Sequence, residues 1–150
     1  MEVAPLLSVD RIFVDAEVSS KKRLLQFIAQ HSGEALELSE DEIFNNLLDR
    51  ERLGSTGLGN GFALPHARLE NLQQTTAFFL QLKQAINYDA PDQQAVDLVF
   101  ALFIPQQATE EHLQILSALA GIFRQAEVCR EIRQADSAEK ILQQIAKAEQ

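Results

Sequence analysis

One segment of the sequence combines residue types that can bind and accept an anion. Four of the six glycines lie between positions 54 and 61, and His66 follows five residues after the last of them. Glycine-rich loops expose backbone N–H groups that bind anions. The two standard nucleotide-binding motifs do not fit, because no Lys-Ser/Thr pair follows the glycines and no Gly-x-Gly-x-x-Gly can be read from them. The segment indicates either an anion-binding loop or a tight surface turn that enters a strand.

The first histidine of interest, His66, is expected at the end of a strand. Phe62, Leu64 and His66 alternate along the chain, so we expect them to share one face of a short strand. Pro65 lacks a backbone N–H and interrupts regular pairing. Open α/β sheets place their sites at strand ends. The structural alternative is a histidine at the sheet edge that only hydrogen-bonds the backbone.

Two further polar residues lie on the apolar stripes of predicted helices. Arg50 comes three residues after Leu47, and an arginine on such a stripe needs an anionic partner or must extend its charged end to solvent. His112 comes four residues before Leu116, at a predicted helix N-terminus where backbone N–H groups favour an anion. Each residue alone has a structural explanation. Together with His66 and the glycine loop, they indicate a phosphate site.

Two helices are expected to precede the glycine-rich segment. The spacing of apolar residues predicts one over about residues 21–32. Ser39, with Glu42 three residues later, fits a capping box for a second helix that ends before Gly54. The apolar stripes are Leu24, Phe27 and Ile28 in the first helix, and Ile43, Phe44, Leu47 and Leu48 in the second.

Strands and further helices follow. Residues 76–82 and 95–104 read as strands, the second apolar on both faces and therefore central in its sheet. Thr109 is the expected N-cap of a helix that follows the second strand. Asp136, with Glu139 three residues later, is the expected N-cap of the last helix. The expected inward positions are Leu116, Leu119, Ala120 and Phe123 in one helix, and Ile141, Leu142 and Ile145 in the other. The pattern predicts an α/β or α+β fold, with one sheet of four or five strands and helices around it.

Composition narrows the class of protein. With 150 residues the chain is long enough for one domain, and no linker or repeat divides residues 1–150. Thirteen Lys and Arg against 22 Asp and Glu give a net charge of −9, which disfavours nucleic acid. The single Cys129 excludes an internal disulfide, and we expect neither a signal peptide nor a membrane-embedded segment. A cytoplasmic location is expected.

The sequence of residues 50–66, RERLGSTGLGNGFALPH, resembles a known signature. It is similar to the phosphohistidine segment of the mannitol/fructose-type IIA domains of the bacterial phosphotransferase system. Within that family the Gly-Ser-Thr-Gly-Leu-Gly-Asn-Gly run looks most like the nitrogen-regulatory branch. The similarity extends over essentially the whole chain, including residues 95–102 and the His112-Leu113 pair.

The resemblance implies a role for each matching residue. His66 would be the phosphorylated nucleophile, His112 its neighbour in the site, and Arg50 the arginine that supports the phosphoryl group. The loop lining the site would comprise Ser55, Thr56, Gly57, Gly59 and Asn60. The implied fold is a mixed sheet of about five strands with helices on both sides. One departure is Ala67, because the family commonly has glycine after the active histidine.

The function implied by the resemblance is that of a phosphocarrier without cofactor or metal. It would accept a phosphoryl group on His66 from a histidine-containing phosphocarrier protein, acting as a phosphotransferase component that regulates partner proteins such as transporters or kinases. A second hypothesis is a sugar-specific IIA component that passes phosphate to a IIB domain. A third, unrelated to phosphate, is a metal-binding module built on His66 and His112, for which the sequence offers no clear third ligand.

Overall fold

Six strands form one mixed sheet in the computed structural model, which describes residues 2–108 and 110–149. The strands are β1 (Ile12–Ala16), β2 (Gly57–Gly59), β3 (Phe62–Ala63), β4 (His66–Leu69), β5 (Thr76–Ile86) and β6 (Val96–Pro105). Their order is β1-β5-β6-β3-β2, and β4 also pairs with β6. Strand β6 is antiparallel to β5 and parallel to β3 and β4, so it is the central strand that the sequence predicts.

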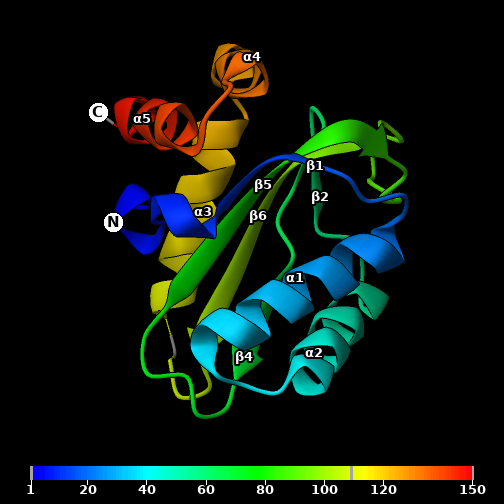
Figure 1. Ribbon diagram of the computed structural model, residues 1–150, viewed down its shortest axis with the longest axis vertical. Coiled ribbons are helices and arrows are strands. Elements are labelled where there is room, and N and C mark those ends of the chain that lie inside the picture. Colours follow the sequence, from blue (N-terminus) through cyan, green and yellow to red (C-terminus); the bar gives the residue numbers. More distant parts are fainter. Residues whose placement is uncertain (1, 109, 150) are drawn as a thin grey trace.

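Five α-helices cover the two faces of this sheet (Figure 1). They are α1 (Lys21–Leu36), α2 (Glu40–Arg52), α3 (Glu111–Phe123), α4 (Ala126–Gln134) and α5 (Ala138–Ala148), and two short 3₁₀ helices, Ala4–Leu6 and Val9–Arg11, precede β1. Helices α1 and α2 pack on one face, and α3, α4, α5 and the N-terminal segment on the other. The predicted class, a mixed sheet flanked by helices, is confirmed. In the described part of the chain, no helix has the length and apolar character needed to cross a bilayer.

Helix caps decide where several of these helices begin. Ser20 and Ser39 accept hydrogen bonds from the backbone N–H groups of Arg23 and Glu42, as expected of N-caps. The predicted cap Asp136 is wrong: Ser137 caps α5, while the Asp136 carboxylate pairs with Lys140 Nζ at 2.9 Å. The other predicted cap, Thr109, lies outside the described residues. Helix α1 also continues to Leu36, past the predicted end.

The expected strand from Phe62 to His66 is divided. Leu64 N–H donates to Thr56 O at 3.0 Å, just beyond the paired Gly57 and Ala63 at the open end of the β2–β3 hairpin, whereas Pro65 O accepts from Leu102 N–H at 3.0 Å. The chain therefore leaves β3 and begins β4 at His66, still along β6. Strand β1 and helix α4 were not predicted, since five and nine residues are too few for a clear period.

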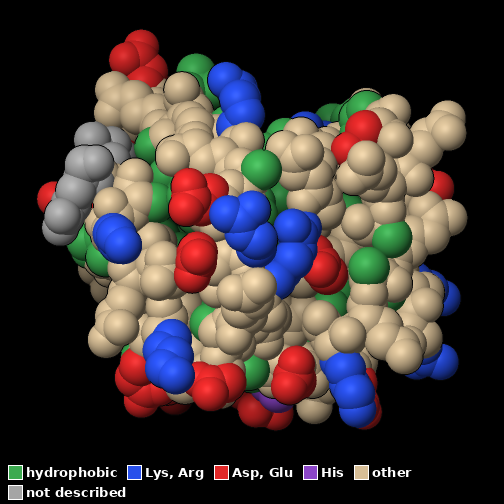
Figure 2. Space-filling model, turned by 90° about the horizontal axis from the view of Figure 1, so that it is seen from above, with side chains coloured by type: hydrophobic (Ala, Val, Ile, Leu, Met, Phe, Trp, Pro, Cys, Tyr) green, Lys and Arg blue, Asp and Glu red, His purple; other side chains and the backbone are tan. Residues whose placement is uncertain are grey.

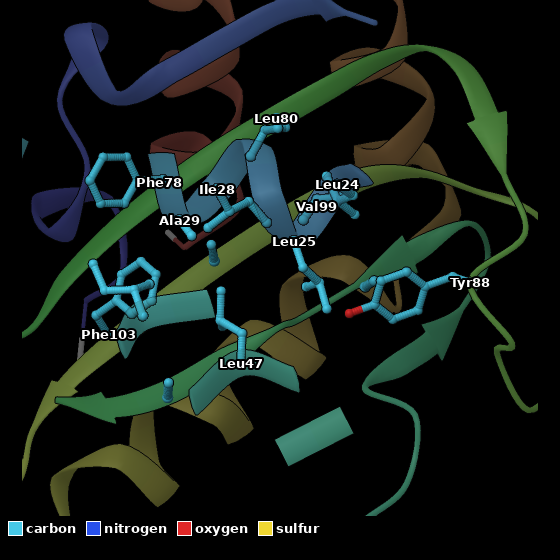
Figure 3. Close-up of a cluster of buried hydrophobic side chains, with 14 of the residues drawn as sticks. Leu24, Leu25, Ile28, Ala29, Leu47, Phe78, Leu80, Tyr88, Val99 and Phe103 are labelled. Carbon is cyan, nitrogen blue, oxygen red and sulfur yellow. The ribbon is translucent and has the colours of Figure 1, made fainter. Parts of the chain in front are cut away.

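Two apolar cores lie on opposite sides of the sheet, and β6 contributes to both by alternation. On the α1–α2 side, its residues Val99, Ala101 and Phe103 meet the helices (Figure 3). That core also contains Leu24, Leu25, Ile28, Ile43, Leu47, Phe78 and Leu80. On the other side lie Phe62, Phe79, Leu98, Phe100, Leu102, Ile115, Leu119, Ile122, Phe123, Ile132, Ile141 and Ile145. Of the predicted inward positions, Leu119, Phe123, Ile141 and Ile145 are buried, while Leu116, Ala120 and Leu142 are half-buried.

We expect Phe123→Ala to lower the free energy of unfolding by about 3–5 kcal/mol. Its ring stacks on Phe62 with centroids 4.0 Å apart and planes 4° apart, and it also contacts Phe79 and Phe100. Urea denaturation measures the change. The control is Leu113→Ala on the same helix, where a side chain 60% exposed should matter by no more than about 0.5 kcal/mol. Equal small losses in both variants would contradict this assignment of the core.

Candidate functional site

The imidazole of His66 is held at the first residue of β4, opposite Leu102 of β6. Its Nδ1 lies 2.9 Å from Leu64 O. A carbonyl oxygen only accepts, so Nδ1 carries the hydrogen and the neutral ring leaves a lone pair on Nε2. The expected position at a strand end is confirmed, although β4 begins at His66 and pairing with β6 continues.

The surroundings of His66 favour its neutral form. Burial is the largest influence and lowers the pKa of the imidazole below its ordinary value of 6.5. The Leu64 carbonyl and the negative charge of Glu51 act in the opposite direction, while the charges of Arg50 and His112 lower the pKa further. A neutral ring with a free lone pair is the nucleophilic form of histidine.

Arg50 lies in the last turn of α2, near His66. Its side chain is half-buried, and Nη1 donates to Gly54 O at 2.9 Å. The predicted stripe of α2 is confirmed at Ile43 and Leu47, which are buried. Arg50 therefore lies at the edge of that stripe. The hydrogen-bond acceptor of its side chain is the carbonyl of Gly54, in the glycine loop. A guanidinium has five N–H donors, so others can meet an anion.

The residue that continues the buried stripe of α2 is Glu51, which the sequence analysis missed. Glu51 is only 7% exposed. Its Oε1 accepts from Thr56 N–H at 3.1 Å and lies 3.0 Å from Lys21 Nζ, and its Oε2 accepts from Thr56 Oγ1. The Thr56 hydroxyl also lies 2.9 Å from the hydroxyl of Tyr88. We call Lys21, Glu51, Thr56 and Tyr88 the Glu51 network.

This network is connected to His66 through the backbone. Thr56 accepts from Leu64 N–H, and Leu64 O in turn holds the His66 Nδ1. Glu51 thus fixes the segment that orients the imidazole. A signal for it exists in the sequence: Ile43, Leu47 and Glu51 recur at intervals of four residues and share one helix face.

The glycine loop divides into a part near His66 and a part away from it. Ser55 and Thr56 are near, since Thr56 pairs with Leu64, and Ser55 Oγ donates to Tyr88 O at 3.3 Å. Gly57 is needed for close packing, because a Cβ there would lie 2.6 Å from that of Ala90.

Gly59 and Asn60 lie at the far end of the hairpin. Asn60 and Gly61 have φ of +58° and +78°, the pattern of an Asn-Gly turn. Phe62 pairs with Leu98 and His66 with Leu102, four residues or about 13 Å further along β6. Asn60 N–H donates to Asp92, and its carbonyl accepts from Arg133. The structure does not bring these two loop residues beside His66.

His112 is half-buried in the first turn of α3, as the sequence predicts, and its charge reaches His66. A second residue missed by the sequence analysis accompanies it. Arg68 Nη2 lies 3.0 Å from His112 Nδ1, and Arg68 Nη1 donates to Ala108 O.

No trio of His, Cys, Asp or Glu suited to a metal ion occurs within residues 2–108 and 110–149.

Ala67 does not crowd the imidazole. Its side chain is 6% exposed and belongs to the α1–α2 core, on the opposite face of β4 from His66. The methyl group that replaces the usual glycine hydrogen therefore points away from the candidate site.

Acidic and basic side chains are mixed on the face drawn in Figure 2. Figure 2 shows one face of the molecule, the upper end in Figure 1, on which basic and acidic side chains stand next to one another. One ion pair of the described chain joins Arg133 and Asp97, with Nη2 and Oδ1 2.9 Å apart. This face carries no extended basic patch of the kind that binds a phosphate backbone.

Comparison with known proteins shows which sequences and folds this chain is similar to. The nitrogen regulatory protein of Pseudomonas aeruginosa is 42% identical over 139 residues, covering 92% of this chain and 90% of that protein. The crystal structure of the nitrogen regulatory protein IIA-Ntr from Neisseria meningitidis superimposes with a TM-score of 0.91 at 39% identity, over 95% of this chain and 97% of that one. The IIA mannitol protein of Escherichia coli shares the fold, with a TM-score of 0.79 at 20% identity over 93% and 99% of the two chains.

The sequence also matches the model of a protein family. The model described as "Phosphoenolpyruvate-dependent sugar phosphotransferase system, EIIA 2" matches residues 5–148. This range of residues includes every helix and strand from β1 to α5. The chain belongs to the EIIA 2 family of the phosphoenolpyruvate-dependent sugar phosphotransferase system.

Proposed function

We propose that this chain is a phosphohistidine phosphocarrier whose phosphorylation state regulates partner proteins. The observation that carries the proposal is the His66 imidazole, anchored at Nδ1 by Leu64 O and free at Nε2, beside the charges of Arg50 and His112. Membership of the EIIA 2 family and similarity to nitrogen regulatory proteins support it. We assign the whole described chain to one IIA domain that acts in the cytoplasm.

In the proposed reaction, Nε2 of His66 attacks the phosphorus of a phosphohistidine on the donor, a histidine-containing phosphocarrier protein. A nitrogen–phosphorus bond forms at His66 while an equivalent bond breaks on the donor, so the transfer is readily reversible. The Nδ1–H of His66 stays on Leu64 O throughout. Catalysis then consists of alignment and of stabilising the negative charge of the transferring group.

Arg50 and His112 are the proposed stabilising groups. The guanidinium of Arg50 is held next to the loop by Gly54 O and keeps further N–H donors for phosphoryl oxygens. His112 adds a donor at the N-terminus of α3, where the helix dipole also favours an anion. Ser55 completes the proposed site, Thr56 holds the segment before His66 through its bonds to Glu51 and Leu64, and Gly57, Gly59 and Asn60 shape the hairpin.

The regulatory output is proposed to be electrostatic. A phosphoryl group adds about 1.5 to 2 negative charges at neutral pH, by analogy with other phosphorylated side chains. Three leucines with more than 45% exposure, Leu53, Leu58 and Leu113, stand in the elements that carry the site, so a partner contacting them would sense this change. Regulated transporters or kinases fit this mode of action.

The family description also supports a second candidate, a sugar-specific IIA component that passes phosphate to a IIB domain. Incubation of the phosphorylated protein with a panel of sugar-specific IIB domains separates the two. Phosphate that no IIB accepts supports the regulatory function, and fast transfer to one IIB would establish the transport function instead. Identical partner sets captured by the phosphorylated and unphosphorylated forms would contradict regulation.

We expect His66→Gln to abolish phosphorylation while the protein remains folded. The reason is that no other side chain would offer the free imidazole nitrogen at this position. The assay uses phosphoenolpyruvate, enzyme I and the phosphocarrier donor, and follows acid-labile label on the protein. His31→Gln, in a histidine packed between Phe13 and Phe27 of the other face, is the matched control and should label normally. Full labelling of the folded His66→Gln variant would refute the assignment.

The pH dependence follows from the environment of His66. Because burial lowers the pKa of this imidazole, the neutral nucleophile persists below pH 6.5, and its protonation is complete only at lower pH. We expect an NMR titration of the His66 ring to give a midpoint below 6.5 and the acceptance rate to fall only at that lower pH. The same difference makes folding stability decrease as pH falls from 6.5 towards the folded-state midpoint. A midpoint above 6.5 would show that the imidazole is not desolvated.

We expect Arg50→Gln to slow single-turnover transfer by about 10²-fold, because a charged donor to the phosphoryl group is lost. Labelling should still occur, since Nε2 of His66 remains. Arg52→Gln is the control: Arg52 lies in the same turn of α2, but its side chain is 69% exposed and pairs with Asp49. Equal rates in both variants would mean that Arg50 only holds the loop.

A further inference from the structure

Two opposite charges of the Glu51 network have no part in the proposed steps of transfer. Glu51 is 7% exposed, and the side chain of Lys21, which is 20% exposed, lies with Nζ 3.0 Å from Oε1 of the carboxylate. Lys21 is the first residue of α1, where the positive end of the helix dipole disfavours a cation and no acidic residue of the first turn compensates it. The Glu51 carboxylate and the Tyr88 ring, whose centroid lies 4.4 Å from Nζ, stabilise the ammonium there.

Three donors hold the Glu51 carboxylate in one orientation. Oε1 accepts from Thr56 N–H at 3.1 Å and faces Lys21, and Oε2 accepts from the Thr56 hydroxyl. Because the single hydrogen of that hydroxyl goes to Glu51, the hydroxyl of Tyr88, 2.9 Å away, donates to Thr56. The carboxylate is therefore bound on both oxygens, and its negative charge stays in one place.

This fixed charge acts on the imidazole of His66. Thr56, which binds the carboxylate, accepts from Leu64 N–H, and Leu64 O holds Nδ1 of His66. Charges that are removed from water are screened weakly, so their influence extends beyond hydrogen-bond distance. Burial is the largest influence on the pKa of His66 and lowers it, whereas the charge of Glu51 raises it. The carboxylate therefore favours positive charge on the ring and disfavours negative charge.

Phosphorylation would add the kind of charge that Glu51 disfavours. In the proposed transfer, a nitrogen–phosphorus bond forms at Nε2 of His66 while the equivalent bond on the donor breaks. Because the two bonds are alike, their surroundings decide the equilibrium. The phosphoryl group adds about 1.5 to 2 negative charges at neutral pH, by analogy with other phosphorylated side chains. The charges of Arg50 and His112 attract this group, and the charge of Glu51 repels it.

We propose that the ion pair of Glu51 and Lys21 sets the equilibrium of phosphoryl transfer, with the carboxylate opposing the phosphorylated form of His66 and the ammonium limiting that opposition. The inference rests on the proposed function, since it concerns the same site. The repulsion keeps the phosphoryl group transferable although Arg50 and His112 attract it. Both residues of the pair act on His66 through their charges, so neither is a catalytic residue.

Two substitutions should move the equilibrium in opposite directions. Glu51→Gln removes the repelling charge and retains an amide that can bond with Thr56, so the equilibrium constant for transfer from the donor should rise about three- to tenfold. Lys21→Met removes the compensating charge, so the constant should fall by a similar factor. Purified phosphorylated donor is mixed with each variant, and the phosphorylated fractions of both proteins are measured once they are constant.

An NMR titration of the His66 ring gives a second measurement that does not require phosphorylation. Relative to the unmodified protein, the midpoint should move to lower pH in Glu51→Gln and to higher pH in Lys21→Met. Thr56→Val separates positioning from charge, because it loses the hydroxyl bond to Glu51 and keeps both charges: transfer should slow while the equilibrium constant changes less than about twofold. Asp49→Asn, in a side chain of α2 that is 69% exposed, is the control and should change neither property.

Both substitutions in the pair weaken the same contact, so a purely structural role would shift the equilibrium constant in the same direction in both, or not at all. Either result would overturn the inference. Circular dichroism confirms that each variant is folded, and if Glu51→Gln does not fold, the sign of the change in Lys21→Met decides. Absence of phosphorylation in the unmodified protein would instead refute the proposed function, and the ring titration would still decide whether the pair acts on His66.

Discussion

A buried carboxylate is the constraint around which the candidate site is built. Glu51 is almost completely removed from water, and a buried charge is tolerated only when it is paired and hydrogen-bonded. Its partners come from three other parts of the fold: Lys21 at the start of α1, Thr56 in the loop before β2, and through Thr56 the hydroxyl of Tyr88 between β5 and β6. The Lys21 ammonium also lies over the Tyr88 ring, 4.4 Å from its centroid. Satisfying this one charge therefore fixes the position of the glycine loop.

The central strand β6 connects the glycine loop with the two histidines. It pairs with β3 and β4 along one edge, so the segment that the Glu51 network holds at Thr56 continues directly into His66. Beyond its last residue, Pro105, the chain returns as α3 and presents His112, which Arg68 joins to β4. The Glu51 carboxylate thus orders the segment before His66, and Arg68 contacts His112 on the other side. The buried imidazole of His66, whose pKa is lowered, lies between them. The arrangement is ordered in the unmodified protein, which is what the proposed phosphoryl transfer by alignment requires.

Sequence reasoning predicted part of the candidate site, and it missed other residues for different physical reasons. His66, Arg50 and His112 could be found because their spacing departs from what a core or a surface needs and because the segment before His66 resembles a family signature. Glu51 and Arg68 were missed because charged residues are usually exposed, and only tertiary partners reveal a buried one. The glycines gave an ambiguous signal: Gly57 serves packing against Ala90, while Asn60 and Gly61 form a hairpin turn away from His66. Asp136 was a poor choice of cap because Ser137, one residue later, competes for the same role.

The proposed mechanism requires that the phosphoryl group bind one particular nitrogen, Nε2 of His66. The most direct measurement is a ¹H–¹⁵N long-range correlation spectrum of the uniformly ¹⁵N-labelled protein, recorded before and after phosphorylation by the donor. The account predicts a phosphorus-coupled Nε2 on His66, with the Nδ1–H retained against Leu64 O and both His112 nitrogens free of phosphorus. Phosphorus on Nδ1 of His66, or on either nitrogen of His112, would contradict the anchoring of the imidazole on which the mechanism is based.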